Sequence, residues 1–215
     1  MTVATRGLFV GALALVGLSA CGSLLPLGGP PANLYTLSPK STFDAALPKV
    51  AWQLVVEEPV AAGGLQVPNI ALRTSALELQ YYANARWSER APAMVQTLLV
   101  ESFENTGKIV SVGRQAVGLR SDFNLKTELR EFQAEYGDVN RAPIIRVRLN
   151  AKVVRQPRRE IVASESFEVA IPANGTAMSD VIVAFDDALG KVIRRTVEWT
   201  MLEGERNARA RPGRS

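Results

Sequence analysis

Residues 142–171 carry the pattern that most restricts how this chain can fold, a regular alternation of apolar and polar side chains. In the first half every second residue is apolar, namely Ile145, Val147, Leu149, Ala151 and Val153. The positions between them are polar, namely Arg146, Arg148, Asn150 and Lys152. A period of two is that of a β-strand with one buried face and one solvated face. After a turn at 156–159, residues 160–171 are predicted to return as the antiparallel partner strand.

A third strand is predicted over residues 121–136, and its pattern contains an irregularity. Buried-type side chains fall at odd positions in 123–129 but at even positions in 132–136. A continuous strand cannot turn its buried side over, so one extra residue must be accommodated near Arg130 and Glu131. We therefore predict a β-bulge there. The three strands together form an antiparallel meander that is buried on one side.

Two other segments change to the period of a helix. Residues 89–107 repeat apolar side chains every three or four positions, with Pro92 suited to the first turn and Gly107 to the stop. Residues 176–202 carry a longer stripe, made of Met178, Ile182, Phe185, Leu189, Val192, Thr196 and Trp199. Gly190 inside this helix is expected to allow close packing. Further short strands are predicted at 33–39, 49–59 and 108–113 and on both sides of a turn near Thr74 and Ser75. The pattern is typical of an α+β fold, a two-layer sandwich with two helices packed on one face of a mainly antiparallel sheet.

The first 33 residues do not share these periodicities. Arg6 precedes an apolar run of about a dozen residues, which is too short for the roughly twenty that a membrane-spanning helix needs. Small residues, Ser19 and Ala20, then stand directly before Cys21, the only cysteine of the chain. We therefore divide the chain into a signal peptide, a flexible tether, a folded domain and a basic disordered tail, at residues 1–20, 21–33, 34–202 and 203–215.

Composition narrows the classes of function. The chain has no histidine, which excludes a His/Cys zinc site and Ser-His or Cys-His catalysis, and a single cysteine excludes an internal disulfide. The net charge of +4 comes mostly from the leader and the tail, so the fold itself is nearly neutral and a nucleic-acid-binding surface is not expected. Asp186 and Asp187 are no paired-carboxylate site, because consecutive residues of a helix do not face each other. We therefore expect a protein that is not an enzyme and holds no metal.

The segment Leu18-Ser19-Ala20-Cys21 resembles the lipobox of bacterial lipoproteins. This resemblance implies cleavage between Ala20 and Cys21, a diacylglycerol on the thiol of Cys21 and an acyl group on the new amino terminus, with no other cofactor. Several acyl chains hold a protein stably where a single chain holds it only marginally. Gly22 follows the cysteine in place of an aspartate. By the same resemblance this favours the outer membrane, with the domain facing the periplasm, over the periplasmic face of the inner membrane.

The folded part resembles the ABC-type transport auxiliary lipoprotein family, which includes the paraquat-inducible protein C lipoproteins. The segments "LYTLSP" (34–39), "VPNIALRTSALELQYYANARWSERAPAMVQTLLVESF" (67–103) and "LKTELREFQAEY" (125–136) carry this resemblance. The matching positions are Arg73, Leu79, Tyr81, Trp87 and Leu98. The resemblance implies a lipid-anchored periplasmic subunit of an intermembrane lipid transport system. Its partners would be a protein of the mammalian-cell-entry (MCE) type and, indirectly, an ABC permease and ATPase. Such a subunit acts by contact rather than catalysis.

Six residues are candidate contacts for a partner or a lipid: Arg73, Tyr81, Trp87, Arg146, Arg148 and Lys152. Two other interpretations stay open, that the aromatic residues pack between sheet and helix and that the basic row is a solvated sheet face. The alternative function is a structural lipoprotein that assists assembly of another outer-membrane complex, as pilotins and lipopolysaccharide-assembly lipoproteins do. The sequence leaves the transported lipid and the oligomeric state, a homo-oligomer included, undecided.

Overall fold

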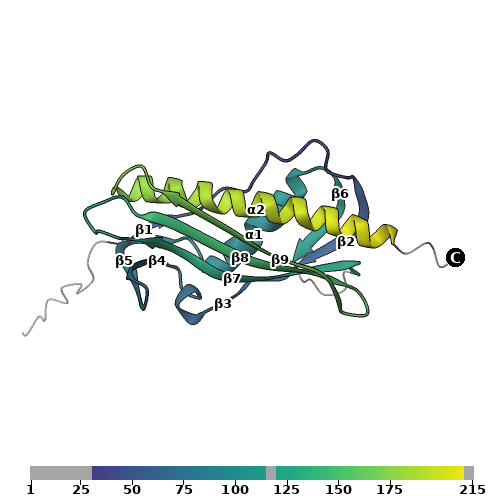
Figure 1. Cartoon of the computed structure of the whole chain (residues 1–215), viewed down its shortest axis with the longest axis horizontal. Coiled ribbons are helices and arrows are strands. Elements are labelled where there is room, and N and C mark those ends of the chain that lie inside the picture. The colour runs from purple at the N-terminus through teal and green to yellow at the C-terminus, as the bar shows by residue number, and fades with distance from the viewer. Residues whose placement is uncertain (1–30, 115–119, 211–215) are drawn as a thin grey trace, which may run out of the picture. The chain divides into compact units, whose positions relative to one another are not determined.

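Strand β7 (Phe123–Glu135) is the central strand of the sheet in the computed structural model, which describes residues 31–114 and 120–210. The predicted cleavage and lipidation site at Ala20 and Cys21 lies outside the described residues. Along one edge, β7 pairs antiparallel with β8 (Ile144–Arg155), which pairs antiparallel with β9 (Glu160–Pro172). These three long strands lie side by side and are the predicted meander (Figure 1).

Three shorter strands pair in succession with the other edge of β7, and all of them run parallel to it. They are β2 (Val50–Val56), β3 (Val60–Ala61) and β4 (Asn69–Ser75), with a 3-10 turn at Gly63–Leu65 between the last two. Beyond β2 and β4 the sheet continues with β6 (Ile109–Arg114), β5 (Glu78–Trp87) and β1 (Asn33–Tyr35). Within the described residues the sheet therefore has nine strands and is mixed, with its longest pairings antiparallel.

The bulge predicted in the third strand of the meander is confirmed. The register between β7 and β8 passes from Leu129 opposite Leu149 to Glu131 opposite Arg148, so Arg130 is the extra residue. On both sides of it the apolar side chains face the same way, and Leu129 and Phe132 are each 1% exposed. The change from odd to even buried positions in the sequence is thus the trace of the bulge itself.

The two predicted helices are confirmed as α1 (Ala91–Asn105) and α2 (Met178–Arg209). Both pack on the face of the sheet that carries the alternating apolar side chains, α1 over β2 and β6 and α2 over β8 and β9. Pro92 stands in the first turn of α1, and Gly107 follows its end with a φ of 62°, a conformation that glycine adopts without steric cost. The predicted α+β two-layer sandwich is therefore confirmed.

The end of the folded domain differs from the prediction. The helix α2 continues past Leu202 to Arg209, so the expectation of a disordered tail is wrong for residues 203–209. Pairs of opposite charge one turn apart support these turns, namely Glu203–Arg206 at 2.8 Å and Glu205–Arg209 at 2.6 Å. The polar composition of this segment thus marks an exposed helical surface.

The close approach in α2 occurs at Gly204 rather than at Gly190. A Cβ atom on Gly204 would lie 2.5 Å from the ring of Trp52 on β2, whereas one on Gly190 would meet its first neighbour at 4.0 Å. The absent side chain therefore lets the last turns of α2 lie directly on the Trp52 ring.

Candidate functional site

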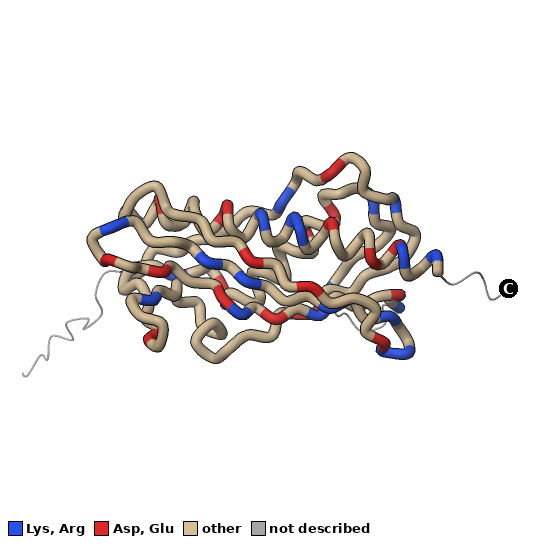
Figure 2. The backbone as a smooth tube through the Cα atoms, viewed as in Figure 1, with Lys and Arg blue, Asp and Glu red and all other residues tan. Residues whose placement is uncertain are grey.

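The face of strands β7, β8 and β9 that is turned away from the helices, here called the open face, carries the predicted row of basic residues. Arg148 lies 3.1 Å from Glu131, and Arg146 contacts both Glu135, at 3.0 Å, and Glu168. Hydrogen bonds to these two carboxylates raise the pKa of the Arg146 guanidinium above its usual value. Blue and red segments alternate along these strands in Figure 2. The middle of the open face is therefore neutralised by local pairs, as the interpretation of a solvated sheet face expects.

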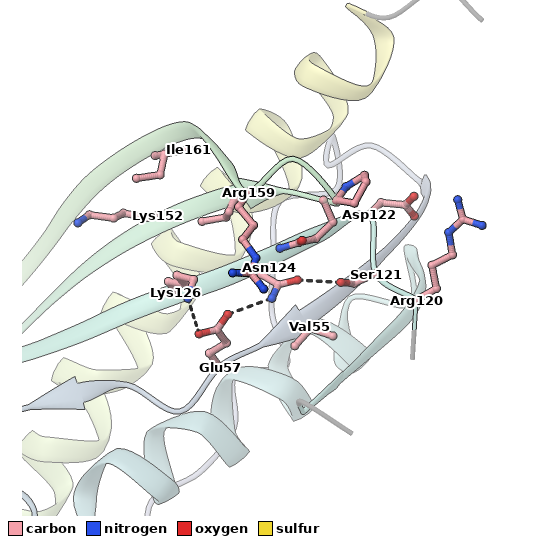
Figure 3. Close-up of a pocket in the computed structure, with 13 residues that line it drawn as sticks. Val55, Glu57, Arg120, Ser121, Asp122, Asn124, Lys126, Lys152, Arg159 and Ile161 are labelled. Carbon is pink, nitrogen blue, oxygen red and sulfur yellow. Dashed lines mark hydrogen bonds and ion pairs between the residues drawn. The ribbon is translucent and has the colours of Figure 1, made fainter. Parts of the chain in front are cut away.

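Lys152, the third residue of the row, has a different environment. It lines a pocket of about 1000 Å³ on the open face, at the end of the sheet where the β8–β9 turn meets β2 and β7 (Figure 3). The lining residues are Val55, Glu57, Arg120, Ser121, Asp122, Asn124, Lys126, Lys152, Val154, Gln156, Pro157, Arg159 and Ile161. The pocket is thus built from four strands and the turn between the last two.

Apolar side chains form part of the pocket wall. Val55 on β2 and Val154 on β8 are 6% and 3% exposed, and neither belongs to the core between sheet and helices. Ile161, on the neighbouring β9, is 56% exposed. The pocket therefore has a small apolar surface on a face that is otherwise charged.

A hydrogen-bonded network fixes the polar wall. The carboxylate of Glu57 accepts hydrogen bonds from the amide of Asn124 and from Lys126, both at 2.9 Å. Ser121 Oγ donates to Asn124 Oδ1 at 2.7 Å, as the dashed lines in Figure 3 show. The side chain of Asp122 is also engaged, because it accepts the backbone N–H of Gln53 at 2.8 Å. Both carboxylates of the pocket thus already have partners.

Positive charge exceeds negative charge around the pocket. Four cationic side chains, Arg120, Lys126, Lys152 and Arg159, stand against two carboxylates. Lys126 is paired with Glu57, while the other three form no ion pair within the described part of the chain. In Figure 3 Arg159 extends over the pocket toward Asn124, whereas Arg120 points away from it. The arrangement suits an anionic ligand with an apolar portion.

Trp87 does not lie on any surface. It is 1% exposed, and its ring centroid lies 5.4 Å from that of Phe132 and 5.2 Å from that of Phe185. The expectation that Trp87 contacts a partner or a lipid is therefore wrong, and the other interpretation, packing between sheet and helix, is what the structure shows. Burial of this large indole ring at the end of β5 stabilises the core.

Arg73 and Tyr81 lie far along the sheet from the pocket. Arg73 lines a smaller depression of about 400 Å³, where β4 and β7 end together, with Glu135 and Tyr136. Tyr81 is 39% exposed, and its hydroxyl donates a hydrogen bond to the carbonyl of Gly64 at 3.0 Å. The six predicted contacts are therefore not brought together into one site.

The tyrosine next to Tyr81 has a structural role. The hydroxyls of Tyr82 and Tyr136 lie 2.8 Å apart and link β5 to the end of β7. Burial, followed by this hydrogen bond, raises the pKa of Tyr82 far above its usual value. The Tyr82 hydroxyl therefore stays protonated and holds two non-neighbouring strands together.

Sequence reasoning missed most of the pocket. Glu57, Asn124 and Arg159 were not among the predicted contacts, because each belongs to a different strand or turn. One local signal was present, namely a pair of arginines, Arg158 and Arg159, in the tight turn between two clearly alternating strands. A cation in such a turn projects from the end of a sheet.

Among the described residues, no group of three or more aspartates, glutamates or cysteines lies in an arrangement that could hold a metal ion. None of the helices within those residues combines the length and the apolar character that crossing a membrane requires.

Known proteins are similar to this chain in sequence or in fold. A family model described as the ABC-type transport auxiliary lipoprotein component matches residues 35–197. A crystal structure of a Xanthomonas campestris protein is similar with 35% identity and a TM-score of 0.78, over 83% of this chain and 99% of that one. A second crystal structure, of an uncharacterized protein, has a TM-score of 0.57 at 14% identity and shows a likeness of fold alone, over 83% of this chain and 99% of that one. An uncharacterized protein of Bradyrhizobium diazoefficiens is 25% identical over 177 residues, which are 81% of this chain and 47% of that relative, so the chain spans about half its length.

Proposed function

Because this chain belongs to the ABC-type transport auxiliary lipoprotein component family, we propose that it is a non-catalytic, lipid-anchored subunit of an intermembrane lipid transport system. In this proposal the acylated Cys21 holds the protein at the outer membrane, with the folded domain in the periplasm. The domain contacts a protein of the MCE type, and through it acts with an ABC permease and ATPase. The system's energy then comes from the ATPase and not from this chain.

The observation that carries the proposal is the extent of the family match. Residues 35–197 run from the last residue of β1 into α2, so the matched part includes strands β2 to β9, all of α1 and the first part of α2. What the family shares is therefore the domain itself and not only a lipoprotein leader.

The polar residues of the open face support action by contact. The carboxylates of Glu131, Glu135 and Glu168 are engaged by arginines, and that of Glu57 by Lys126 and Asn124. A general acid or base needs a carboxyl group that is available to a substrate. These pairs instead give a polar surface of fixed geometry, which suits recognition of another protein.

The anchor is tested by replacing Cys21 with alanine. We expect the wild-type protein to co-sediment with outer-membrane fractions. Its mature form should begin at Cys21 and carry the added mass of the acyl groups on that residue. The Cys21→Ala protein should keep its leader or appear in the soluble fraction. A Cys21→Ala protein that is still processed and membrane-bound would show that the lipobox interpretation is incorrect.

The partner is tested by crosslinking in intact envelopes of a host that contains the MCE-type protein and the transporter. A photo-reactive amino acid is placed at Asn150, in the middle of the open face, and at Val183, an exposed position on α2 that serves as the matched control. We expect a crosslink to the MCE-type protein from position 150 and none from position 183. The absence of a crosslink from position 150 would overturn the proposed partnership.

A further inference from the structure

We infer that the pocket at the β8–β9 turn binds the phosphate headgroup of an anionic lipid, with Arg159 and Lys152 as the cations that hold the phosphate. This goes beyond the proposed function, in which the domain acts through protein contacts, and it gives the domain a lipid site of its own. The chemistry that the pocket recognises is a phosphate group, and its apolar wall selects a phosphate that is attached to a lipid.

The charges of the pocket are arranged for an external anion. Glu57 is already satisfied by Lys126 and Asn124, so it does not neutralise the remaining cations. Lys152 and Arg159 have no carboxylate partner within the described residues and line the same hollow. An arginine presents several donors in one plane, and a lysine adds a point charge, which together match the oxygens of a phosphate.

The backbone of Arg159 supports a role beyond a turn residue. Its φ is 57°, in the left-handed region where glycine and asparagine are favoured and other side chains destabilise the turn. With the backbone in this conformation, the guanidinium of Arg159 lies over the pocket and points toward Asn124 (Figure 3). Backbone strain of this kind is concentrated where a protein needs a side chain in one position.

The size and apolar part of the pocket favour a lipid over a free phosphate. Its volume of about 1000 Å³ exceeds what one phosphate fills and lies at the upper end of ordinary ligand pockets. The side chain of Ile161, which is 56% exposed, would stay uncovered beside a bare phosphate. The glycerol and first methylenes of a lipid would cover it. An acidic peptide would match the charges equally, but its polar backbone would gain no favourable contact with this apolar wall.

The test uses the full-length lipoprotein, purified in a non-ionic detergent and studied by native mass spectrometry with equal amounts of phosphatidylglycerol and phosphatidylcholine. We expect one retained phosphatidylglycerol. The double variant Arg159→Ala/Lys152→Ala should lower its occupancy at least about tenfold, since one hydrogen bond to a charged group is worth about 1.5 kcal/mol or more. Arg141→Ala is the matched control, because Arg141 is an exposed arginine, 85% for its side chain, in the loop between β7 and β8. It should retain the lipid.

Four results would overturn the inference. Equal retention of the two lipids would show that the pocket does not distinguish an anionic headgroup from a zwitterionic one, and equal retention by wild type and the double variant would show that Arg159 and Lys152 do not hold the phosphate. Displacement of the lipid by an equal concentration of inorganic phosphate would make it a free-phosphate site. Displacement by a polyglutamate peptide at lower concentration than phosphatidylglycerol would make it a site for an acidic protein segment.

Arg159→Gly separates binding from folding. Glycine tolerates the positive φ, so the Tm of this variant should not fall, while its lipid occupancy should fall, as is expected for the double variant. A lower Tm together with unchanged lipid occupancy would give Arg159 a purely structural role. Failure here leaves the crosslink to the MCE-type protein unaffected, and absence of that crosslink leaves the lipid occupancy unaffected, so the two proposals fail separately.

Discussion

The two faces of the meander β7–β9 use neighbouring residues for different purposes. Phe132 is 1% exposed and packs against Trp87 and Phe185, with ring centroids 5.4 and 5.1 Å away. The residue before it, Glu131, lies on the open face and pairs with Arg148 in an interaction that solvent reaches, with side chains 18% and 38% exposed. One step along a strand therefore separates the residues that hold the fold from those that present a surface.

This difference indicates how the chain can specialise without unfolding. The covered face is apolar and packs against both helices in one core. A substitution there therefore disturbs the packing of the whole core. The open face carries ion pairs and the pocket at the β8–β9 turn, and surface pairs contribute little to stability. Residues of the open face can therefore be selected for recognition.

The largest expected effect is on the covered face. Phe132→Ala removes a ring from the contact of β7, β5 and α2 and should lower the free energy of unfolding by about 3–5 kcal/mol. Urea denaturation followed by circular dichroism measures this loss. A loss below about 1 kcal/mol would contradict the view that this cluster is the centre of the core.

A smaller effect is expected where α2 ends. Gly204→Val places carbon atoms in the space of the Trp52 ring, 2.5 Å from the nearest ring atom, and should cost about 1–3 kcal/mol. Gly190→Ala is the control in the same helix, because its Cβ meets nothing closer than 4.0 Å, and it should stabilise by up to about 1 kcal/mol. Both values come from thermal and urea denaturation. Equal effects of the two changes would show that the helix does not rest on Trp52 at its end.

The sequence predicted what is set by local periodicity. The alternation in 142–171 predicted β8 and β9 and their buried face, and the change from odd to even positions in β7 predicted the bulge at Arg130. The pattern alone does not decide whether Trp87 packs in the core or lines a groove, because an aromatic residue at a strand end has the same pattern in both; the structure shows it in the core.

What depends on distant segments was not predictable from one sequence. The sequences of β2, β3 and β4 do not indicate that these strands pair with the same edge of β7. Parallel strands are joined by long crossover connections, so their pairing does not show in the local pattern of either strand. The pocket follows from that arrangement, because it brings Glu57 beside Lys126 and beneath the turn that carries Arg159. The extension of α2 past Leu202 was not predictable for a related reason. Gly204 allows the helix to contact the ring of Trp52, and Trp52 lies far away in the sequence.

The smallest effect on stability is expected for the ion pair between Glu131 and Arg148 on the open face. Glu131 is next to Phe132, whose replacement is expected to have the largest effect. Glu131→Ala, Arg148→Ala and the double variant form a thermodynamic cycle for the pair, whose charged atoms lie 3.1 Å apart. Its coupling energy should stay below about 1 kcal/mol and decrease in salt, because water reaches both side chains and screens their attraction. Denaturation of the four proteins at low and high salt gives the value. A coupling of about 3 kcal/mol or more, comparable with the loss in Phe132→Ala, would mean that both faces of the strand hold the fold and that the open face is not free to vary for recognition.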